Sequence, residues 1–494
     1  MKLSQFLSQA KVDFAISGDP SQIEIEDIAI DSRLVKKNSV FFALPGKSKD
    51  GLEFIPDAIK NGAVATVAAA TLSRGEGGFL ITTSNPFSLL THFLKTFYAS
   101  LPTNIYAITG TNGKTSIAEF TRQILEFLGK KSASIGSLGV MTTQRGIQLQ
   151  NSSLTTPDIV SLYKNLHSLK KSGIDDVAIE VSSIGLEQGR VAGLKIDVGS
   201  FTNFTQDHLD YHKSMDDYFK CKMILFERVL ENGGENGGAA VLNSDIPEFE
   251  KIKKICEEKN LRVIEYGFKA RDLRLLGIRD YHVTFEFRQK KYEFELNISG
   301  EFQVFNVLCA LGNVLAKNDL DEAQLKNLLK NFHLLQPAPG RMQRVATLPN
   351  RAQIFIDSAH SPDALANVLK LARGLTKSRV IVLFGCGGDR DAGKRPIMGR
   401  IACDLADVVI VTDDNPRSEK AEVIRAEIFA ACDVAKATEI ADRKVAIEKV
   451  ITTLKAGDVL IFAGKGHEKY QIIGAEKFEF DEEKIAKDVL TKLS

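Results

Sequence analysis

The sequence predicts an α/β protein of three domains, and three observations support this prediction. The chain has 494 residues, which is too long for one hydrophobic core. Short apolar runs alternate with helical patterns along most of its length, as expected of parallel sheets covered by helices. Breaks at Pro102 and at 337–340 interrupt this alternation, because proline and glycine do not continue a helix. We therefore expect domains at residues 1–101, 102–336 and 337–494.

Composition restricts the classes of partner. The chain is 44% hydrophobic and 26% charged, which is typical of a globular protein in water. Its 64 Lys and Arg residues nearly balance 63 Asp and Glu residues, so no overall field attracts nucleic acid or a membrane surface. No apolar run approaches the roughly 18 residues of a membrane span. Six scattered cysteines without a Cys-x-x-Cys pair indicate reduced thiols. We expect a cytoplasmic protein with no nucleic-acid partner and no membrane insertion.

Each predicted domain has its own pattern of elements. The first is an α/β domain, with strands expected at 23–30 and 39–44 and a helix at 51–60. The second alternates strand and helix as far as about Phe332, which predicts a parallel sheet. The third predicts a doubly wound, Rossmann-like sheet with strands at Ile354–Ile356, Val380–Phe384, Val408–Val411 and Val459–Phe462.

The most specific motif opens the central domain. An apolar strand at 105–108 leads into Thr-Gly-Thr-Asn-Gly-Lys-Thr, and a helical pattern follows from Ile117. Such a turn places backbone N–H groups around a phosphate, while Lys114 supplies a positive charge and Thr115 can reach Mg²⁺. Only two residues separate the glycines, against about four in the strict P-loop. The motif predicts a P-loop-like ATPase domain; an accidental glycine-rich turn is the alternative.

Two further segments of the central domain carry polar residues after strands. Glu180 ends a predicted strand at 177–179, where it would either bind Mg²⁺ or cap the next helix. The segment 201–212 ends in Asp-His-Leu-Asp-Tyr-His, which suits a metal or phosphate contact. Its alternative is a helix start, with Asp207 as the cap and His208 incidental.

Four polar segments also follow the strands of the third domain. Because the carboxyl ends of parallel strands share one edge of a sheet, these segments predict a ligand site there. They are Asp357–Pro362, Gly385–Arg390, Asp413–Arg417 and Ala463–Glu468.

The phosphate-loop motif resembles the ATP loop of Mur ligases and folylpolyglutamate synthetases. The Asp-His-Leu-Asp-Tyr-His segment, followed by a spacer and a lysine, is similar to a second Mur ligase signature. In that family the lysine carries a carbamate formed from CO₂. Aligning Tyr218 with the tyrosine of the family signature implies that this lysine is Lys222, four residues further along the sequence, rather than Lys220. A carbamate requires a neutral amine, so the surroundings of the lysine must disfavour ammonium.

The resemblance implies a set of residues for ATP and Mg²⁺. The ATP-binding residues would be Gly110, Thr111, Asn112, Gly113, Lys114, Thr115, Ser116, Asn306, Arg341 and Asp357. The catalytic residues would be Lys114, Glu180, His208 and Lys222. Mg²⁺ would be held by Thr115, Glu180, His208 and carbamylated Lys222.

Other segments look like the site for UDP-MurNAc-L-Ala-D-Glu in the family members that add the third stem-peptide residue. This resemblance makes the first domain a UDP-binding domain. The implied contacts are Ile30, Ser32, Lys47, Ser48, Lys49, Leu154, Thr155, Thr156, Ser182, Gln188 and Arg190. Arg190 has a solvated surface arginine as its alternative. Members often have His after the Ser-Ser pair, where this chain has Ile184.

The segment Asp-Asn-Pro-Arg resembles the specificity motif of members that use meso-diaminopimelate. A guanidinium can hold the distal carboxylate of diaminopimelate, which lysine lacks. The implied pocket is Arg390, Asp414, Asn415, Pro416, Arg417, Gly464 and Glu468, with Glu468 suited to the distal ammonium. The alternative is a simple Asn-Pro turn, with Arg417 at a helix start.

The resemblance therefore implies an ATP-dependent amide ligase of peptidoglycan precursor synthesis, acting through an acyl phosphate. The third domain would close about the hinge at 337–340. A lysine-adding member, a folylpolyglutamate-type ligase and an ATP-gated switch protein are the alternatives.

Overall fold

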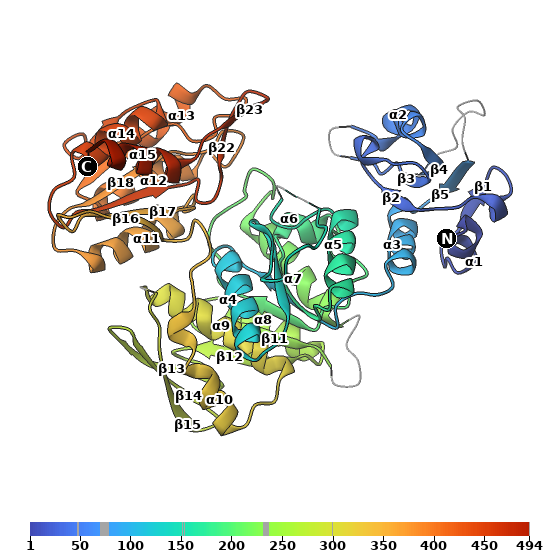
Figure 1. The fold of residues 1–494 in the computed structure, drawn as a ribbon, viewed down its shortest axis with the longest axis horizontal. Coiled ribbons are helices and arrows are strands. Elements are labelled where there is room, and N and C mark those ends of the chain that lie inside the picture. The colour runs from blue at the N-terminus through green and yellow to red at the C-terminus, as the bar shows by residue number, and fades with distance from the viewer. Residues whose placement is uncertain are drawn as a thin grey trace.

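The computed structural model describes residues 1–46, 49–69, 79–150, 152, 154–230, 237–298 and 300–493. Within these residues, three large sheets are built from successive parts of the chain, and Figure 1 shows them as three separate bodies. No helix of the described chain is long and apolar enough to cross a membrane. The six cysteines are not joined by disulfide bonds.

The N-terminal body has a five-stranded sheet in the order β1-β5-β4-β3-β2, and only β1 runs antiparallel to its neighbour. Its strands are β1 (Phe14–Ile16), β2 (Asp27–Ala29), β3 (Ser39–Phe42), β4 (Ala63–Ala68) and β5 (Phe79–Thr83). Its helices are α1 (Leu3–Ser8), α2 (Ile55–Lys60) and α3 (Pro86–Phe97). The strand expected at 23–30 is therefore shorter than predicted, and a 3₁₀ turn at Gly51–Phe54 precedes α2.

The central body has a ten-stranded sheet in the order β15-β14-β13-β12-β11-β10-β6-β9-β7-β8. Its strands are β6 (Asn104–Thr109), β7 (Ser132–Gly136), β8 (Gly139–Met141), β9 (Asp176–Glu180), β10 (Val198–Phe201), β11 (Ala239–Asn243), β12 (Arg262–Gly267), β13 (Leu273–Arg279), β14 (His282–Phe287) and β15 (Lys290–Glu295). Its helices are α4 (Lys114–Phe127), α5 (Ile159–Lys171), α6 (Ser183–Glu187), α7 (Met215–Leu230), α8 (Phe249–Glu258), α9 (Glu301–Lys317) and α10 (Glu322–Leu329).

This sheet is parallel in its middle, as predicted, but antiparallel at both ends, where β8 pairs with β7 and where β13, β14 and β15 form a meander. In its middle, β6 lies between β9 and β10. The register places Ile108 beside Glu180 and Thr109 beside Phe201. The segments that follow these three strands therefore begin at one edge of the sheet.

The C-terminal body has a six-stranded sheet in the order β16-β17-β21-β18-β19-β20, parallel except for β16. Its strands are β16 (Gln343–Thr347), β17 (Gln353–Asp357), β18 (Val380–Phe384), β19 (Val408–Val411), β20 (Ala437–Glu439) and β21 (Val459–Ala463), and β22 (Tyr470–Ile473) pairs with β23 (Glu476–Glu479) in a separate ribbon. Helices α11 (Pro362–Leu375), α12 (Lys394–Leu405), α13 (Ala421–Phe429), α14 (Arg443–Thr452) and α15 (Glu482–Leu493) alternate with them. The four strands expected here are confirmed.

Candidate active site

The phosphate loop joins β6 to α4, and its two glycines are required by the space around them. Gly110 has φ +139° and Gly113 has φ +88°, which disfavours any residue with a side chain. A Cβ at Gly110 would lie 1.9 Å from Thr202 Oγ1, and one at Gly113 would lie 2.6 Å from Asn306 Oδ1. Helix α4 begins at Lys114, earlier than the expected Ile117. The loop therefore presents the N-terminus of α4 to an anion.

Two lysine amines donate hydrogen bonds to the same backbone oxygen of this loop. Lys114 Nζ donates to the backbone oxygens of Gly110 at 3.0 Å and Thr111 at 2.7 Å. Lys222 Nζ, from α7, donates to the same Gly110 oxygen at 2.7 Å. Lys222 is only 1% exposed, and its amine lies 4.3 Å from the centre of the Tyr218 ring. Burial, reinforced by the Lys114 charge, holds the pKa of Lys222 well below its usual value.

These surroundings distinguish Lys222 from its rival. Lys220 is exposed, whereas the lowered pKa of Lys222 favours the neutral amine that carbamate formation requires.

Glu180 lies at the end of β9, only 2% exposed, and its carboxylate accepts hydrogen bonds from Ser137 and Thr115. The Ser137 N–H donates to it at 2.8 Å and Thr115 Oγ1 donates at 2.9 Å. Burial raises the pKa of Glu180, while the charges of Arg341 and Lys114 oppose that rise. The helix-cap alternative for Glu180 is wrong, because Ser182 caps α6 through Gly185.

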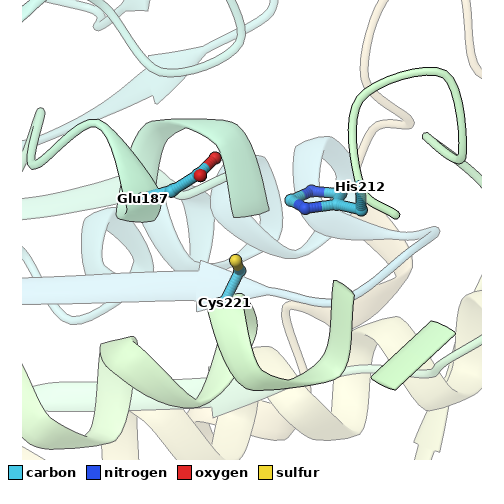
Figure 2. A group of neighbouring side chains, drawn as sticks. All are labelled: Glu187, His212 and Cys221. Atoms are coloured by element: carbon cyan, nitrogen blue, oxygen red, sulfur yellow. The ribbon is translucent and has the colours of Figure 1, made fainter. Parts of the chain in front are cut away.

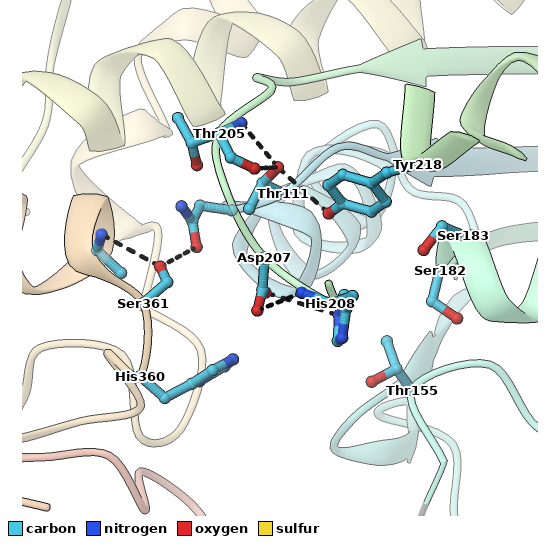
Figure 3. Close-up of polar contacts among 12 residues, drawn as sticks. Thr111, Thr155, Ser182, Ser183, Thr205, Asp207, His208, Tyr218, His360 and Ser361 are labelled. Carbon is cyan, nitrogen blue, oxygen red and sulfur yellow. Dashed lines mark hydrogen bonds and ion pairs between the residues drawn. The ribbon is translucent and has the colours of Figure 1, made fainter. Parts of the chain in front are cut away.

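Asp207 and His208 lie in an irregular segment near Thr111 and Tyr218, as Figure 3 shows. His208 has a left-handed backbone with φ +55°, and Asp207 accepts its N–H at 2.9 Å. Burial lowers the pKa of His208 to about 4, although Asp207 opposes the shift, so the imidazole is neutral at pH 7. The helix-start alternative is wrong, because α7 begins only at Met215.

The C-terminal body reaches the phosphate loop directly. Asn112 Nδ2 donates to Asp363 Oδ2 at 3.0 Å, and Arg341 Nη2 donates to Thr115 Oγ1 at 2.9 Å. Lys394 Nζ lies 3.9 Å from Asp207 Oδ1. Sequence reasoning missed Asp363 and Lys394, because their roles depend on how two domains meet.

A cleft of about 900 Å³ lies where these parts meet. Its lining includes the phosphate loop, Glu180, His208, Asn306, Arg341 and Asp357. Apart from Gly110, the ATP residues expected in different predicted domains therefore line one cleft.

A second group surrounds Thr156, beside Glu180. Thr156 Oγ1 donates to the Glu180 backbone oxygen at 3.0 Å and accepts the Ser182 N–H at 2.9 Å. Arg190 donates from Nη1 to Thr156 O at 2.8 Å and from Nη2 to Gln188 Oε1 at 2.7 Å. Arg190 is half-buried and held by these acceptors, so the solvated-arginine alternative does not describe it.

The remaining residues expected at the UDP substrate are spread over two bodies. Thr155 accepts from Ser137 Oγ at 3.1 Å, close to the Thr156 group, and Leu154 is exposed. The others belong to the N-terminal body, whose strand β2 contacts the central body through Asp27 and Lys164, 2.7 Å apart. They are Ile30, Ser32 and the exposed Lys49. Lys47 and Ser48 lie outside the described residues.

The Asp-Asn-Pro-Arg segment follows β19 at the edge of the C-terminal sheet. Asn415 Nδ2 donates to Glu468 Oε2 at 3.0 Å, and Arg417 Nη1 donates to Gly388 O at 2.8 Å. Burial, with Asp414 nearby, raises the pKa of Glu468. Because α13 begins only at Ala421, Arg417 is not at a helix start, and that alternative is wrong.

Other members of this group take different positions. Asp414 is buried, and a Cβ at Gly464 would lie 2.7 Å from its Oδ2. Arg390 is exposed and donates to its neighbour Asp389. Sequence reasoning missed Lys465, which is buried and donates to Asn415 Oδ1 at 3.0 Å. The sequence feature that could have identified Lys465 is its position between Gly464 and Gly466, directly after a strand.

Comparison with known proteins assigns all three bodies to one family. Residues 24–85 match "Mur ligase family, catalytic domain", residues 108–314 match "Mur ligase middle domain", and residues 340–466 match "Mur ligase, glutamate ligase domain". A curated relative from Bradyrhizobium diazoefficiens is 40% identical over 503 residues, and the alignment covers 100% of this chain and 100% of the relative. The chain belongs to the Mur ligase family.

That relative is named UDP-N-acetylmuramoyl-L-alanyl-D-glutamate--2,6-diaminopimelate ligase. A solved structure of a protein with the same name is 29% identical, with a TM-score of 0.65 and coverage of 100% of this chain and 99% of that chain. The MurF ligase from Thermotoga maritima, solved in complex with ADP, has a TM-score of 0.64 at 16% identity over 95% of this chain and 98% of that one, which supports the fold alone.

Proposed function

We propose that this chain uses ATP to join meso-diaminopimelate to UDP-MurNAc-L-Ala-D-Glu in peptidoglycan precursor synthesis. Relatives that are 40–41% identical over nearly the whole chain carry the name of that ligase. The observation that carries the proposal is the cleft at which the phosphate loop, Glu180 and Arg341 meet. This cleft is lined both by neighbours of Thr156 (Thr155 and Ser182) and by residues of the C-terminal body.

The reaction proceeds in two displacements. An oxygen of the substrate carboxylate attacks the γ-phosphorus of ATP, the bond from that phosphorus to the ADP oxygen breaks, and an acyl phosphate forms. The amine of diaminopimelate then attacks the acyl carbon, loses a proton, and expels inorganic phosphate. Positioning and charge neutralisation supply most of the rate in phosphoryl transfer. Lys114 and Arg341, which contact Thr111 and Thr115 of the phosphate loop, would supply the positive charge.

The residues around Thr115 fit Mg²⁺. Thr115 Oγ1 and a Glu180 carboxylate oxygen lie 2.9 Å apart, and such hard oxygen donors suit that ion. His208, neutral at pH 7, and carbamylated Lys222 would complete the set. Bound there, Mg²⁺ would neutralise charge on the transferring phosphoryl group.

The carbamate at Lys222 would form from the neutral amine and CO₂ with release of one proton. Its carboxylate would place a negative charge under the phosphate loop, where the unmodified residue has a neutral amine. The depressed pKa of Lys222 supports this assignment, because an ammonium group cannot attack CO₂.

Two arginines would select the substrates. Arg190, held by Thr156 and Gln188, suits an anionic part of the UDP substrate. Arg417 would hold the distal carboxylate of diaminopimelate, while Glu468 faces its ammonium. A lysine-adding enzyme would leave the Arg417 charge against the lysine ammonium, which is unfavourable.

Phosphate release tests this proposal directly. With ATP and Mg²⁺, phosphate should appear only when UDP-MurNAc-L-Ala-D-Glu and meso-diaminopimelate are both present. An amino-acid panel including L-lysine and L-glutamate tests the alternatives. Phosphate release without the amine would favour an ATP-gated switch protein, and a preference for L-lysine or L-glutamate would reject the diaminopimelate assignment.

A further inference from the structure

A cluster of three metal-binding side chains lies beside α7, and the ATP site does not use it. Glu187 comes from the end of α6, His212 from the segment that precedes α7, and Cys221 from α7 itself. Figure 2 shows the three side chains pointing toward a common space. One ligand atom from each lies within 4.8 Å of the other two.

The fold holds these groups together. Helix α6 packs against α7, which brings the end of one helix over the first turns of the other. His212 is buried, and its Nε2 lies 2.9 Å from Ser183 Oγ. This hydrogen bond fixes the orientation of the ring, as outer hydrogen-bond partners do in many metal sites.

The cluster is also open to an entering ion. Glu187 is exposed and Cys221 is half-buried, so solvent reaches one side of the group. A water molecule can therefore supply a fourth ligand. Three protein ligands with one open position make a common four-coordinate zinc arrangement.

The donor set selects the kind of ion. A thiolate sulfur, an imidazole nitrogen and a carboxylate oxygen are the ligands of Zn²⁺ and similar borderline-soft ions. Mg²⁺ prefers oxygen throughout, as at Thr115 and Glu180. We propose that Glu187, His212 and Cys221 form a second metal site, specific for one Zn²⁺-class ion. Binding replaces the Cys221 thiol proton by a sulfur–metal bond and releases that proton to solvent.

Such an ion would connect three segments that also serve the ATP site. Helix α6 begins with Ser183 beside Ser182, the segment before α7 carries His208, and Lys222 directly follows Cys221 in α7. Binding at the second site would therefore fasten the His208 segment to the helix that carries Lys222.

The test uses Co²⁺ as a spectroscopic substitute for Zn²⁺ on the full-length chain, with Mg²⁺ in excess. A sulfur-to-cobalt charge-transfer band in the near ultraviolet should appear with one equivalent of Co²⁺ and vanish when Zn²⁺ displaces it. Cys221→Ser should abolish the band. Cys432→Ser, which removes another half-buried thiol in the C-terminal body, should leave it intact.

Zn²⁺ affinity, measured by competition with a chromophoric chelator, gives a second readout. Glu187→Gln should weaken binding by more than about tenfold, since even loss of an outer-shell partner of a metal ligand costs that much. Glu187 is exposed, so this variant should fold even if Cys221→Ser does not. No charge-transfer band in the wild type, or unchanged Zn²⁺ affinity in Glu187→Gln, would overturn the proposal. Neither result depends on ligase activity.

Discussion

Replacing Arg417 by lysine should weaken the use of meso-diaminopimelate while preserving the positive charge. Within the described chain only Nη1 of Arg417 donates hydrogen bonds, to the backbone oxygens of Gly388 at 2.8 Å and Asn415 at 3.5 Å, which leaves Nε and Nη2 for a carboxylate. Burial lowers the pKa of Arg417. The same burial means that water screens the charge of its guanidinium less than at an exposed position. A charge-assisted hydrogen bond there is worth about 1.5–3 kcal/mol. The loss corresponds to roughly ten- to a hundredfold in kcat/KM.

The assay is competition between meso-diaminopimelate and L-lysine for the same UDP substrate. Arg417→Lys should lower the ratio of kcat/KM for diaminopimelate to kcat/KM for L-lysine by the same roughly ten- to a hundredfold, without making L-lysine a good substrate. Arg351→Lys is the matched control, because Arg351 is also an arginine with a left-handed backbone, at φ +64° against +52° for Arg417. It lies in an exposed turn between β16 and β17. A selectivity ratio unchanged in Arg417→Lys would refute the assignment.

Three further changes test the centre of the site. Lys222→Ala should nearly abolish ligation but leave the fold intact, and acetate or formate should partly restore activity by replacing the carbamate. Lys114→Ala should lower kcat more than it raises KM, because its charge acts on the phosphoryl group during transfer. With a chelator present, His208→Asn should lose less stability than the wild type between pH 7 and pH 5, measured by urea unfolding. The pKa of His208 in the folded wild type is about 4, below the ordinary value of about 6.5. As the pH decreases, the unfolded chain therefore takes up a proton before the folded chain does, and the free energy of unfolding decreases between pH 7 and pH 5.

Each of these has its own control. Lys220→Ala, on the same helix but exposed, should retain ligation; near wild-type turnover in Lys222→Ala would remove the carbamate assignment. A Lys114→Ala variant altered only in KM for the UDP substrate would require another role for that residue. Asparagine suits the left-handed backbone at His208. Equal pH dependence in His208→Asn and wild type would show that His208 does not titrate as inferred.

Periodicity predicted local structure well where the strand is buried on both faces. The strands Val380–Phe384 and Val408–Val411 have the bounds that the sequence indicated, because continuous apolar runs mark them clearly. The polar segments after the strands also gather at sheet edges as expected. Contacts between bodies could not be predicted, since the pair Asn112–Asp363 depends on domain placement rather than on local pattern.

The meander of β13, β14 and β15 shows another limit. Its last hairpin turns at Arg288 and Gln289, with φ of +51° and +62°. Such two-residue turns are recognised by Asn-Gly or Asp-Gly, which suit positive φ. Here neither residue gives that signal. Buried and less buried residues alternate along β14 (His282–Phe287), but so short an alternation does not indicate whether the strand is parallel or antiparallel.

The shared acceptor beneath the phosphate loop makes two lysines chemically interdependent. Lys114 and Lys222 both donate to the Gly110 oxygen, and the Lys114 charge helps to lower the pKa of Lys222. Removing Lys114 would raise the pKa of Lys222 and reduce the fraction of its amine available to CO₂. A double-mutant cycle of the two positions should therefore be strongly non-additive. A substitution at the phosphate loop thus also alters a modification made on a different helix.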